Sequence, residues 1–229
     1  ESSREFSGSA AWRDSHVLFR GLLATQASEL FDAFWKGDRE YLPPTAGPQS
    51  SLLIPNQTRA CRHRLRCLYR DIVTGAAESI ELTTPYFVPD SRTQHTLMSA
   101  ARRGVDVRVL VPRKIDVRLV GWAAHAAYAN LLDAGVRIYE YLPRMLHAKT
   151  MVVDGNWATL GTANVDYRSF FLNYEVNLIT RDPTLCRSLH DQFATDLGEA
   201  EQIVTSQWPK RGWREHVSEA IGWWARRWL

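Results

Sequence analysis

The chain has 229 residues, of which 45% are hydrophobic and 23% are charged. This is the profile of a globular protein long enough to bury a sizeable core, and it excludes a chain that is disordered overall. The formal net charge of +3 is too small to require a nucleic-acid partner by itself. No apolar run approaches the roughly 20 residues of a membrane span, and no signal peptide is recognisable. We therefore expect any membrane contact to be peripheral.

Cysteine usage points to a reducing environment on the cytosolic side. The chain has three cysteines, Cys61, Cys67 and Cys186, an odd number without the clustering of a metal site. Five residues separate Cys61 from Cys67, and this spacing argues against zinc. We expect reduced thiols, no metal and no other cofactor.

The first 47 residues hold too few elements for an independent domain. Alternating residues from Trp12 to Gly21 predict a strand, and an apolar stripe from Ala24 to Trp35 predicts a helix. The Pro- and Gly-rich stretch 41–48 is typical of a linker. We expect a main domain over residues 48–206.

Strands and helices alternate through this main domain. The pattern predicts helices over 62–76, 91–103 (capped by Ser91), 117–133 and 182–197, and strands over 79–84, 105–111, 136–141 and 174–180. Strands joined through such helices are typical of βαβ units in a sheet covered on both faces. The expected fold class is α/β, with a mixed, mostly parallel sheet flanked by helices.

The stretch from His147 to Asn164 is predicted to be a hairpin. Two β-prone runs, 150–153 and 157–160, flank Gly155-Asn156, which can form a two-residue turn. The resulting register places three pairs opposite one another: Asp154 with Trp157, Lys149 with Thr162, and His147 with Asn164.

The open end of this hairpin gathers groups that suit a phosphoryl anion. His147 and Lys149 are two residues apart and point to the same face, with Asn164 across from them. An imidazole, a cation and an amide donor therefore converge. The alternative is a buried strand whose polar residues only edge the sheet.

The wider pattern resembles a known family. The spacing His-x-Lys-x4-Asp-x6-Gly-x2-Asn resembles the signature of the phospholipase D superfamily. Four segments in order resemble bacterial cardiolipin synthases in particular: Thr-Pro-Tyr-Phe-Val-Pro-Asp at 84–90, Ala-Arg-Arg-Gly-Val-Asp-Val-Arg-Val-Leu-Val-Pro at 101–112, Ala-Gly-Val-Arg-Ile-Tyr-Glu-Tyr-Leu at 134–142, and Met-Leu-His-Ala-Lys-Thr at 145–150.

This resemblance implies a phospholipase D-like sandwich in which two similar halves share one active site. Residues 1–47 are then the remnant of a first catalytic half plus linker, and 48–206 the second half. The first His-x-Lys motif would lie upstream of Glu1 or on a second copy. The implied reaction converts two phosphatidylglycerol molecules to cardiolipin and glycerol through a phosphatidyl-histidine.

The resemblance also implies roles for individual residues. His147 is expected to be the acid/base group, although the roles of the two histidines stay open. Lys149 and Asn164 are expected to bind phosphoryl oxygens. Asp154 belongs to the catalytic motif, but its place at the turn favours a structural role. Glu175 is expected to accept a bond from the His147 ring and fix its tautomer, with a surface salt bridge as the alternative.

Further side chains are expected around the substrate. Tyr86 and Phe87 are candidate walls of the active-site mouth, with a packed loop above the sheet as the alternative. Arg168 and Ser169, together with Asp166, are candidates for holding the site or a lipid head group.

Residues 207–229 form a basic, Trp-rich tail. Its apolar residues fall on one helical stripe: Trp213, Val217, Ala220, Ile221, Trp224 and Trp228. Such a helix suits an anionic membrane interface, contacted by Trp213, Trp224, Trp228, Arg226 and Arg227. The expected location is the cytoplasmic face of a bacterial inner membrane. Packing of the stripe against the catalytic domain is the competing interpretation.

Three other functions stay open. The same hairpin occurs in nucleases of the superfamily, although no nucleic-acid partner is expected here. A phospholipase that hydrolyses its lipid is a closer rival. An inactive half that only binds membranes is the third alternative, and the intact motif argues against it.

Overall fold

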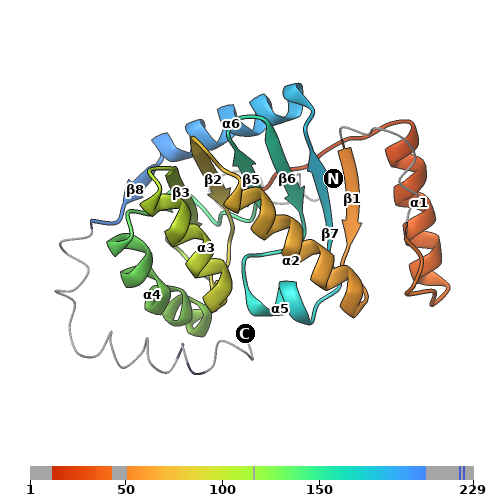
Figure 1. The fold of residues 1–229 in the computed structure, drawn as a ribbon, viewed down its shortest axis with the longest axis horizontal. Coiled ribbons are helices and arrows are strands. Elements are labelled where there is room, and N and C mark those ends of the chain that lie inside the picture. The colour runs from red at the N-terminus through yellow and green to blue at the C-terminus, as the bar shows by residue number, and fades with distance from the viewer. Residues whose placement is uncertain (1–11, 43–50, 116, 205–221, 223, 225–229) are drawn as a thin grey trace.

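The computed structural model describes residues 12–42, 51–115, 117–204, 222 and 224 (Figure 1). The described elements, in chain order, are α1 Leu22–Trp35, β1 Ser51–Pro55, α2 Arg59–Thr74, β2 Ser79–Thr83, α3 Ser91–Arg102, β3 Asp106–Pro112, α4 Arg118–Asp133, β4 Arg137–Tyr141, β5 Thr150–Val153, β6 Trp157–Gly161, α5 Tyr167–Phe171, β7 Val176–Thr180, α6 Pro183–Gly198 and β8 Ala200–Gln202.

The eight described strands form one sheet in the order β1-β7-β6-β5-β2-β3-β4-β8. The α/β class is confirmed, but the prediction of a mostly parallel sheet is wrong. Only β2–β3 and β3–β4 are parallel, while the other five neighbouring pairs are antiparallel. Parallel neighbours need a crossover of a dozen or more residues. The α3 and α4 crossovers supply it. Among the later strands, β5 and β6 form a hairpin, and the segments with α5 and α6 lead to strands that pair antiparallel to their neighbours.

Helices cover both faces of the sheet (Figure 1). Helices α2, α3 and α4 lie on one face and α6 lies on the other. Alternate residues of β2 show the division. Ile80 and Leu82 enter the main core with α2 and α3, whereas the buried Glu81 carboxylate binds His190 of α6 at 2.9 Å. The central strands are therefore buried on both faces.

The predicted helices and strands of the main domain are present with ends shifted by a few residues. The cap of α3 is Asp90, whose carboxylate accepts from the Thr93 N–H at 2.8 Å, so the prediction of Ser91 was wrong by one residue. Two edge strands, β1 and β8, were not predicted. Strand β1 has the sequence Ser-Leu-Leu-Ile-Pro, which does not alternate, and β8 has only three residues.

The predicted strand over 12–21 is wrong. Only Arg13 makes a bridge, parallel to Leu146. The Arg13 N–H donates to the Met145 carbonyl at 2.8 Å, and the His147 N–H donates to the Arg13 carbonyl at 2.7 Å. Residues 14–20 find no strand to pair with in the described part of the chain, so their alternation is not realised as a strand.

The β5–β6 hairpin differs from the prediction by one residue. Asp154 and Gly155 have φ of 50° and 63°, and the Asn156 N–H closes the turn on the Val153 carbonyl. Aspartate tolerates this left-handed conformation, so it enters the turn rather than the ladder. Val153 therefore pairs with Trp157. The predicted opposition of Lys149 with Thr162 and of His147 with Asn164 does not form, and the Lys149 carbonyl instead accepts from Gly161.

Most of the tail and the linker lies outside the described residues, including Trp213, Trp228, Arg226 and Arg227. Gly222 is helical and buried, and a Cβ there would come within 2.4 Å of the Ala123 backbone nitrogen on α4. Trp224, also helical, is 79% exposed. Among the described helices, none has the length and hydropathy required to cross a membrane.

Candidate active site

The strand directions place the predicted site residues near one end of the sheet. Strands β5 and β7 begin at this end, and their partners β2 and β6 finish there, because Thr150 pairs with Thr83 and Gly161 pairs with Asn177. His147 and Lys149 lie just before β5. Asn164 lies a few residues after β6, and Glu175 lies immediately before β7. A short antiparallel region therefore collects four of the predicted site residues.

The His147 ring is held by an aspartate from the beginning of the chain. Its Nδ1 lies 2.9 Å from Oδ2 of Asp14, and the Trp12 ring packs on it at 4.7 Å between centroids. Burial raises the pKa of Asp14, but the bond to His147, the Ser15 N–H and nearby charges outweigh burial and hold that pKa below its usual value. The His147 side chain is 32% exposed, so it stays open to a substrate.

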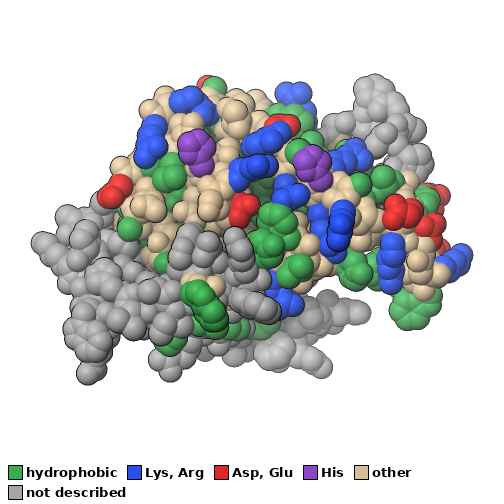
Figure 2. Space-filling view, turned by 60° about the horizontal axis from the view of Figure 1, so that its bottom comes forward, with side chains coloured by type: hydrophobic (Ala, Val, Ile, Leu, Met, Phe, Trp, Pro, Cys, Tyr) green, Lys and Arg blue, Asp and Glu red, His purple; other side chains and the backbone are tan. Residues whose placement is uncertain are grey.

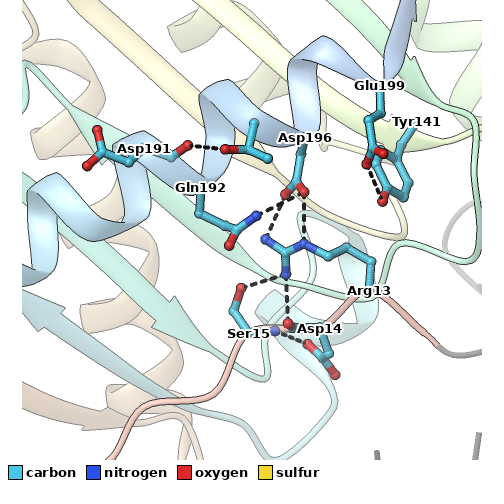
Figure 3. Close-up of polar contacts among 9 residues, drawn as sticks. Arg13, Asp14, Ser15, Tyr141, Asp191, Gln192, Asp196 and Glu199 are labelled. Atoms are coloured by element: carbon cyan, nitrogen blue, oxygen red, sulfur yellow. Dashed lines mark hydrogen bonds and ion pairs between the residues drawn. The ribbon is translucent and has the colours of Figure 1, made fainter. Parts of the chain in front are cut away.

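Arg13 fixes the segment that carries Asp14 (Figure 3). Its Nε and Nη2 bind the two carboxylate oxygens of Asp196 on α6, at 2.9 and 2.7 Å. Its Nη1 donates to the Asp14 carbonyl at 2.6 Å and to Ser15 Oγ at 3.1 Å. The buried bidentate pair between Arg13 and Asp196 therefore connects the Asp14 backbone to helix α6.

Lys149 lies beside the reactive edge of the imidazole. Its Nζ is 3.1 Å from His147 Nε2 and donates to the His147 carbonyl at 2.6 Å. Burial lowers the pKa of Lys149 to about 8, opposed by the charges of Asp14, Glu175 and Asp166.

Glu175 does not hold the His147 ring, contrary to expectation. Its carboxylate accepts from Thr162 Oγ1 at 2.5 Å and from Asn173 Nδ2 at 3.3 Å. Its backbone N–H donates to Asn56 Oδ1. The position immediately before β7 aims the Glu175 side chain at the loop after β6, and the Nδ1 side of the ring is already taken by Asp14.

The Asn164 loop is built around a buried aspartate. The Asn164 N–H donates to Ser169 Oγ at 3.1 Å, and the Asp166 carboxylate caps α5 by accepting from the Ser169 N–H. Burial raises the pKa of Asp166 to about 6, and the Glu175 charge adds to this effect against the Ser169 and Asn164 hydrogen bonds. The Asn164 side-chain oxygen is buried without a partner in the described residues. This oxygen is an acceptor, so any group that satisfied it would have to be a hydrogen-bond donor.

Asp154 lies at the opposite end of the hairpin from His147. Its carboxylate accepts from the backbone N–H groups of Ala77, Glu78 and Ser79 at 2.8–2.9 Å. Burial raises the pKa of Asp154, but these three donors outweigh it and hold the pKa below its usual value. This motif carboxylate joins the hairpin turn to the start of β2, away from the reacting groups.

Three of the four residues expected to contact the substrate pack inside the protein or against its core instead. Phe87 is 1% exposed and packs in the core near Tyr128, so it does not form a mouth wall. Ser169 is fully buried and serves the Asn164 loop. Tyr86 is half-buried against the same core. Arg168, the fourth, is exposed to solvent.

Sequence reasoning missed Asp14, together with Arg13 and Trp12. The available signal was a charged pair, Arg-Asp, inside an otherwise alternating segment. Its meaning depends on contacts with residues 133 and 183 positions away, which no local pattern contains. Within the described ranges, no three His, Cys, Asp or Glu side chains gather into a group that could hold a metal ion.

Known structures share this architecture. A phospholipase D family member, Nuc from Salmonella typhimurium, superposes with a TM-score of 0.59 at 20% identity, over 67% of this chain and 97% of that one. A phosphatidylserine synthase of Haemophilus influenzae superposes with a TM-score of 0.57 at 13% identity, over 90% of this chain and 52% of that one. The fold is that of the phospholipase D superfamily.

Sequence comparison identifies the family within this superfamily. Residues 69–197 match the family described as "Cardiolipin synthase, PLD-like domain". A cardiolipin synthase of Geobacillus thermodenitrificans is 37% identical over 221 residues, 92% of this chain and 44% of the relative. Cardiolipin synthase 2 of Bacillus anthracis is 37% identical over 224 residues, 91% and 43% respectively. The chain belongs to the cardiolipin synthase family of phospholipase D-like domains, and it spans less than half the length of these relatives.

Proposed function

We propose that the natural protein containing this sequence is a cardiolipin synthase, a phosphatidyltransferase that joins two phosphatidylglycerol molecules and releases glycerol. The observation that carries the proposal is the His147 cluster. Its Nδ1 is bound by Asp14, and its Nε2 lies beside the ammonium of Lys149. Family membership and relatives named cardiolipin synthase give the substrate class.

The cluster suits proton transfer at a phosphodiester. With Asp14 accepting from Nδ1–H, the ring is held in the tautomer that leaves Nε2 free to take or give a proton. Lys149 Nζ, now next to Nε2, is placed to bind a phosphoryl oxygen as negative charge builds up. The side-chain nitrogen of Asn164 is the proposed second donor to the same oxygens, because the amide oxygen can only accept a hydrogen bond.

The transfer proceeds in two displacements. A histidine nitrogen attacks phosphorus of the first lipid, the P–N bond forms, and the P–O bond to glycerol breaks. The other histidine gives its proton to the departing glycerol oxygen. That histidine then takes a proton from the hydroxyl of a second phosphatidylglycerol, whose oxygen attacks phosphorus and breaks the P–N bond. We assign His147 to the acid/base role, because Asp14 holds its Nδ1 and leaves Nε2 to exchange the proton.

The second histidine is proposed to come from a complementary first half, of which residues 12–35 are the end. Large apolar side chains on this segment are open to solvent, as a surface that packs against further chain would be: Leu18 is 81% exposed, Phe31 62% and Trp35 79%. A second copy of this chain is the alternative source. An intact-mass measurement of the natural protein distinguishes them, because a mass well above 26.2 kDa indicates a longer chain.

We propose that the basic tail over 207–229 holds the enzyme on the anionic cytoplasmic face of the inner membrane as a peripheral protein. Trp224, with 79% of its surface exposed, is available for that contact. Sedimentation with phosphatidylglycerol vesicles, with and without residues 210–229, tests this role. Unchanged vesicle binding by the truncated protein contradicts it.

The reaction type is tested by following all the products of labelled phosphatidylglycerol. Transfer gives cardiolipin and glycerol, whereas hydrolysis gives phosphatidate. A parallel assay with duplex and single-stranded DNA tests nuclease activity. Accumulation of phosphatidate alone, or DNA cleavage without lipid turnover, overturns the proposal.

A further inference from the structure

A cavity of about 310 Å³ lies between α2 and α3, on the face of the sheet opposite α6. Its volume falls within the range of about 300–1,000 Å³ typical of ligand sites. None of His147, Lys149, Asn164 or Glu175 lines it. Val165 and Phe170 do line it, so the cavity lies behind the loop that carries Asn164 and Ser169. It is a separate site that shares one wall with the candidate active site.

The floor of the cavity is apolar. Leu82 and Met151 of the sheet, Leu97 of α3 and Phe170 of α5 contribute side chains that are almost wholly buried. The space is about twice the 150 Å³ of a cavity that holds benzene, so it has room for on the order of ten methylene groups. This is enough for a substantial part of one aliphatic chain and too little for two.

The rim of the cavity is cationic. Arg66 and Arg70 of α2 and Arg92 of α3 line it against a single carboxylate, that of Asp90. Asp90 is engaged by the Thr93 N–H of the α3 cap. Figure 2 shows the corresponding face, where Lys and Arg side chains gather around a hollow with hydrophobic side chains inside it.

The rim charges are only weakly compensated by neighbours. The Arg70–Asp71 pair, at 2.8 Å, has side chains 43% and 62% exposed, so water screens it. Arg66 stacks over the Phe171 ring at 4.1 Å and has no ion pair with any described residue. Arg92 is exposed, likewise with no ion pair in the described part of the chain. Positive charge around an apolar well is complementary to an amphiphile with an anionic head.

We propose that this cavity binds an anionic phospholipid, with one acyl chain in the well and the phosphate at the Arg66–Arg70–Arg92 rim. Such a site would hold the α2–α3 face against a membrane whose lipids carry negative charge. The inference goes beyond the proposed transferase function, because its residues are not those of the His147 site, and it stands or falls separately.

Cys67 on the rim provides a direct readout. It is half-exposed and lines the cavity, whereas Cys61 and Cys186 are buried. Alkylation by N-ethylmaleimide, located by peptide mass spectrometry, therefore measures access to the cavity. Dodecyl phosphate, below its micelle concentration, should slow Cys67 alkylation about tenfold at ten times its Kd. Inorganic phosphate and dodecanol, which have only the head or only the chain, should each protect far less.

Charge reversal tests the rim. Arg92→Glu should weaken protection by dodecyl phosphate, whereas Arg64→Glu should not, because Arg64 is also exposed but lies on α2 without lining the cavity. Vesicles containing phosphatidylglycerol should protect Cys67 more than vesicles of phosphatidylcholine, and should do so equally in His147→Ala protein. This last result separates the site from the proposed catalysis.

Three outcomes overturn the inference. Equal protection by dodecanol means an apolar well without head-group recognition, and equal protection by inorganic phosphate means an anion site without a chain. Protection that Arg92→Glu and Arg64→Glu reduce alike means that overall charge, rather than this rim, attracts the lipid.

Discussion

Arg13 and Asp196 form a bidentate ion pair across 183 residues of sequence, with side chains only 10% and 4% exposed. The pair joins the segment that carries Asp14 to the last long helix, α6 (Figure 3). Asp14 in turn binds the ring of His147. Two charged contacts in series therefore connect the outer helix to the candidate catalytic histidine.

Breaking this pair should destabilise the fold. Asp196→Asn leaves the Arg13 guanidinium buried without its counter-charge, which costs about 3–5 kcal/mol of unfolding free energy. Urea unfolding measures the change. Asp191→Asn on the same helix is the control, since that side chain is exposed and should change stability by no more than about 0.5 kcal/mol. Equal stabilities for the two variants would show that the pair contributes nothing.

Removing the Asp14 charge should impair turnover more than binding. Asp14→Asn loses the acceptor that selects the His147 tautomer, so kcat should fall by about 10²-fold or more with a small change in KM. Ring-nitrogen NMR of His147 should register the altered tautomer. Glu175→Gln should leave the ring signals unchanged, because Glu175 contacts Thr162 and Asn173 instead. The same NMR change in Glu175→Gln, with none in Asp14→Asn, would restore Glu175 as the orienting residue.

We expect Lys149 to lower the stability of the folded protein and to be necessary for activity. Its pKa is lowered by burial to about 8, from 10.5 for a free lysine. Between these values the unfolded chain holds the proton and the folded chain does not, so this group makes stability rise with pH across that window. Below pH 8 the full cost remains. Lys149→Met should therefore raise the unfolding free energy at pH 7 by about 1–3 kcal/mol while abolishing turnover.

The control for this variant is Lys36→Met, which removes an exposed cation at the end of α1. Thermal or urea unfolding of both variants gives the comparison. A Lys149→Met protein less stable than the unmodified one at pH 7 would mean that the ammonium holds the fold together instead of being retained for function.

Asp154 should act on stability and not on chemistry. Its carboxylate is held below its usual pKa by three backbone donors, despite burial. The stabilisation is present above pH 3.8, the unfolded value, and is lost as pH falls through the lower folded value. Asp154→Asn, which tolerates the positive φ, should cost about 1–3 kcal/mol at pH 7. The deficit should shrink in acid, and residual activity should follow the folded fraction.

Local sequence patterns were sufficient to predict most elements of the main domain, although not β1 and β8. Helices such as α3 and α6 have apolar stripes bounded by an aspartate cap, and both features lie within a few residues. The strand order could not be predicted in the same way, because β5 to β7 join the parallel strands through pairings set by tertiary packing. The predicted hairpin register was wrong because of one residue, Asp154, whose positive φ places it in the turn instead of the ladder.

The candidate site was only partly predictable. His147 and Lys149 are two residues apart, so their proximity follows from the sequence. The carboxylate that holds the ring does not, because Asp14 reaches it from the far end of the chain. Glu175 is nearer to His147 in sequence and was predicted to orient its ring. Its side chain points to the Asn164 loop instead. A motif indicates which groups react, whereas their orientation depends on distant contacts.

The central claim is that His147 carries out phosphatidyl transfer, and product analysis tests it most directly. The natural protein and its His147→Ala variant are incubated with phosphatidylglycerol vesicles, and cardiolipin and glycerol are quantified after circular dichroism shows that both proteins are folded. We predict equimolar cardiolipin and glycerol from the unmodified protein, and at least about 10²-fold slower formation by the variant. Cardiolipin formation at an unchanged rate by folded His147→Ala protein would contradict the claim.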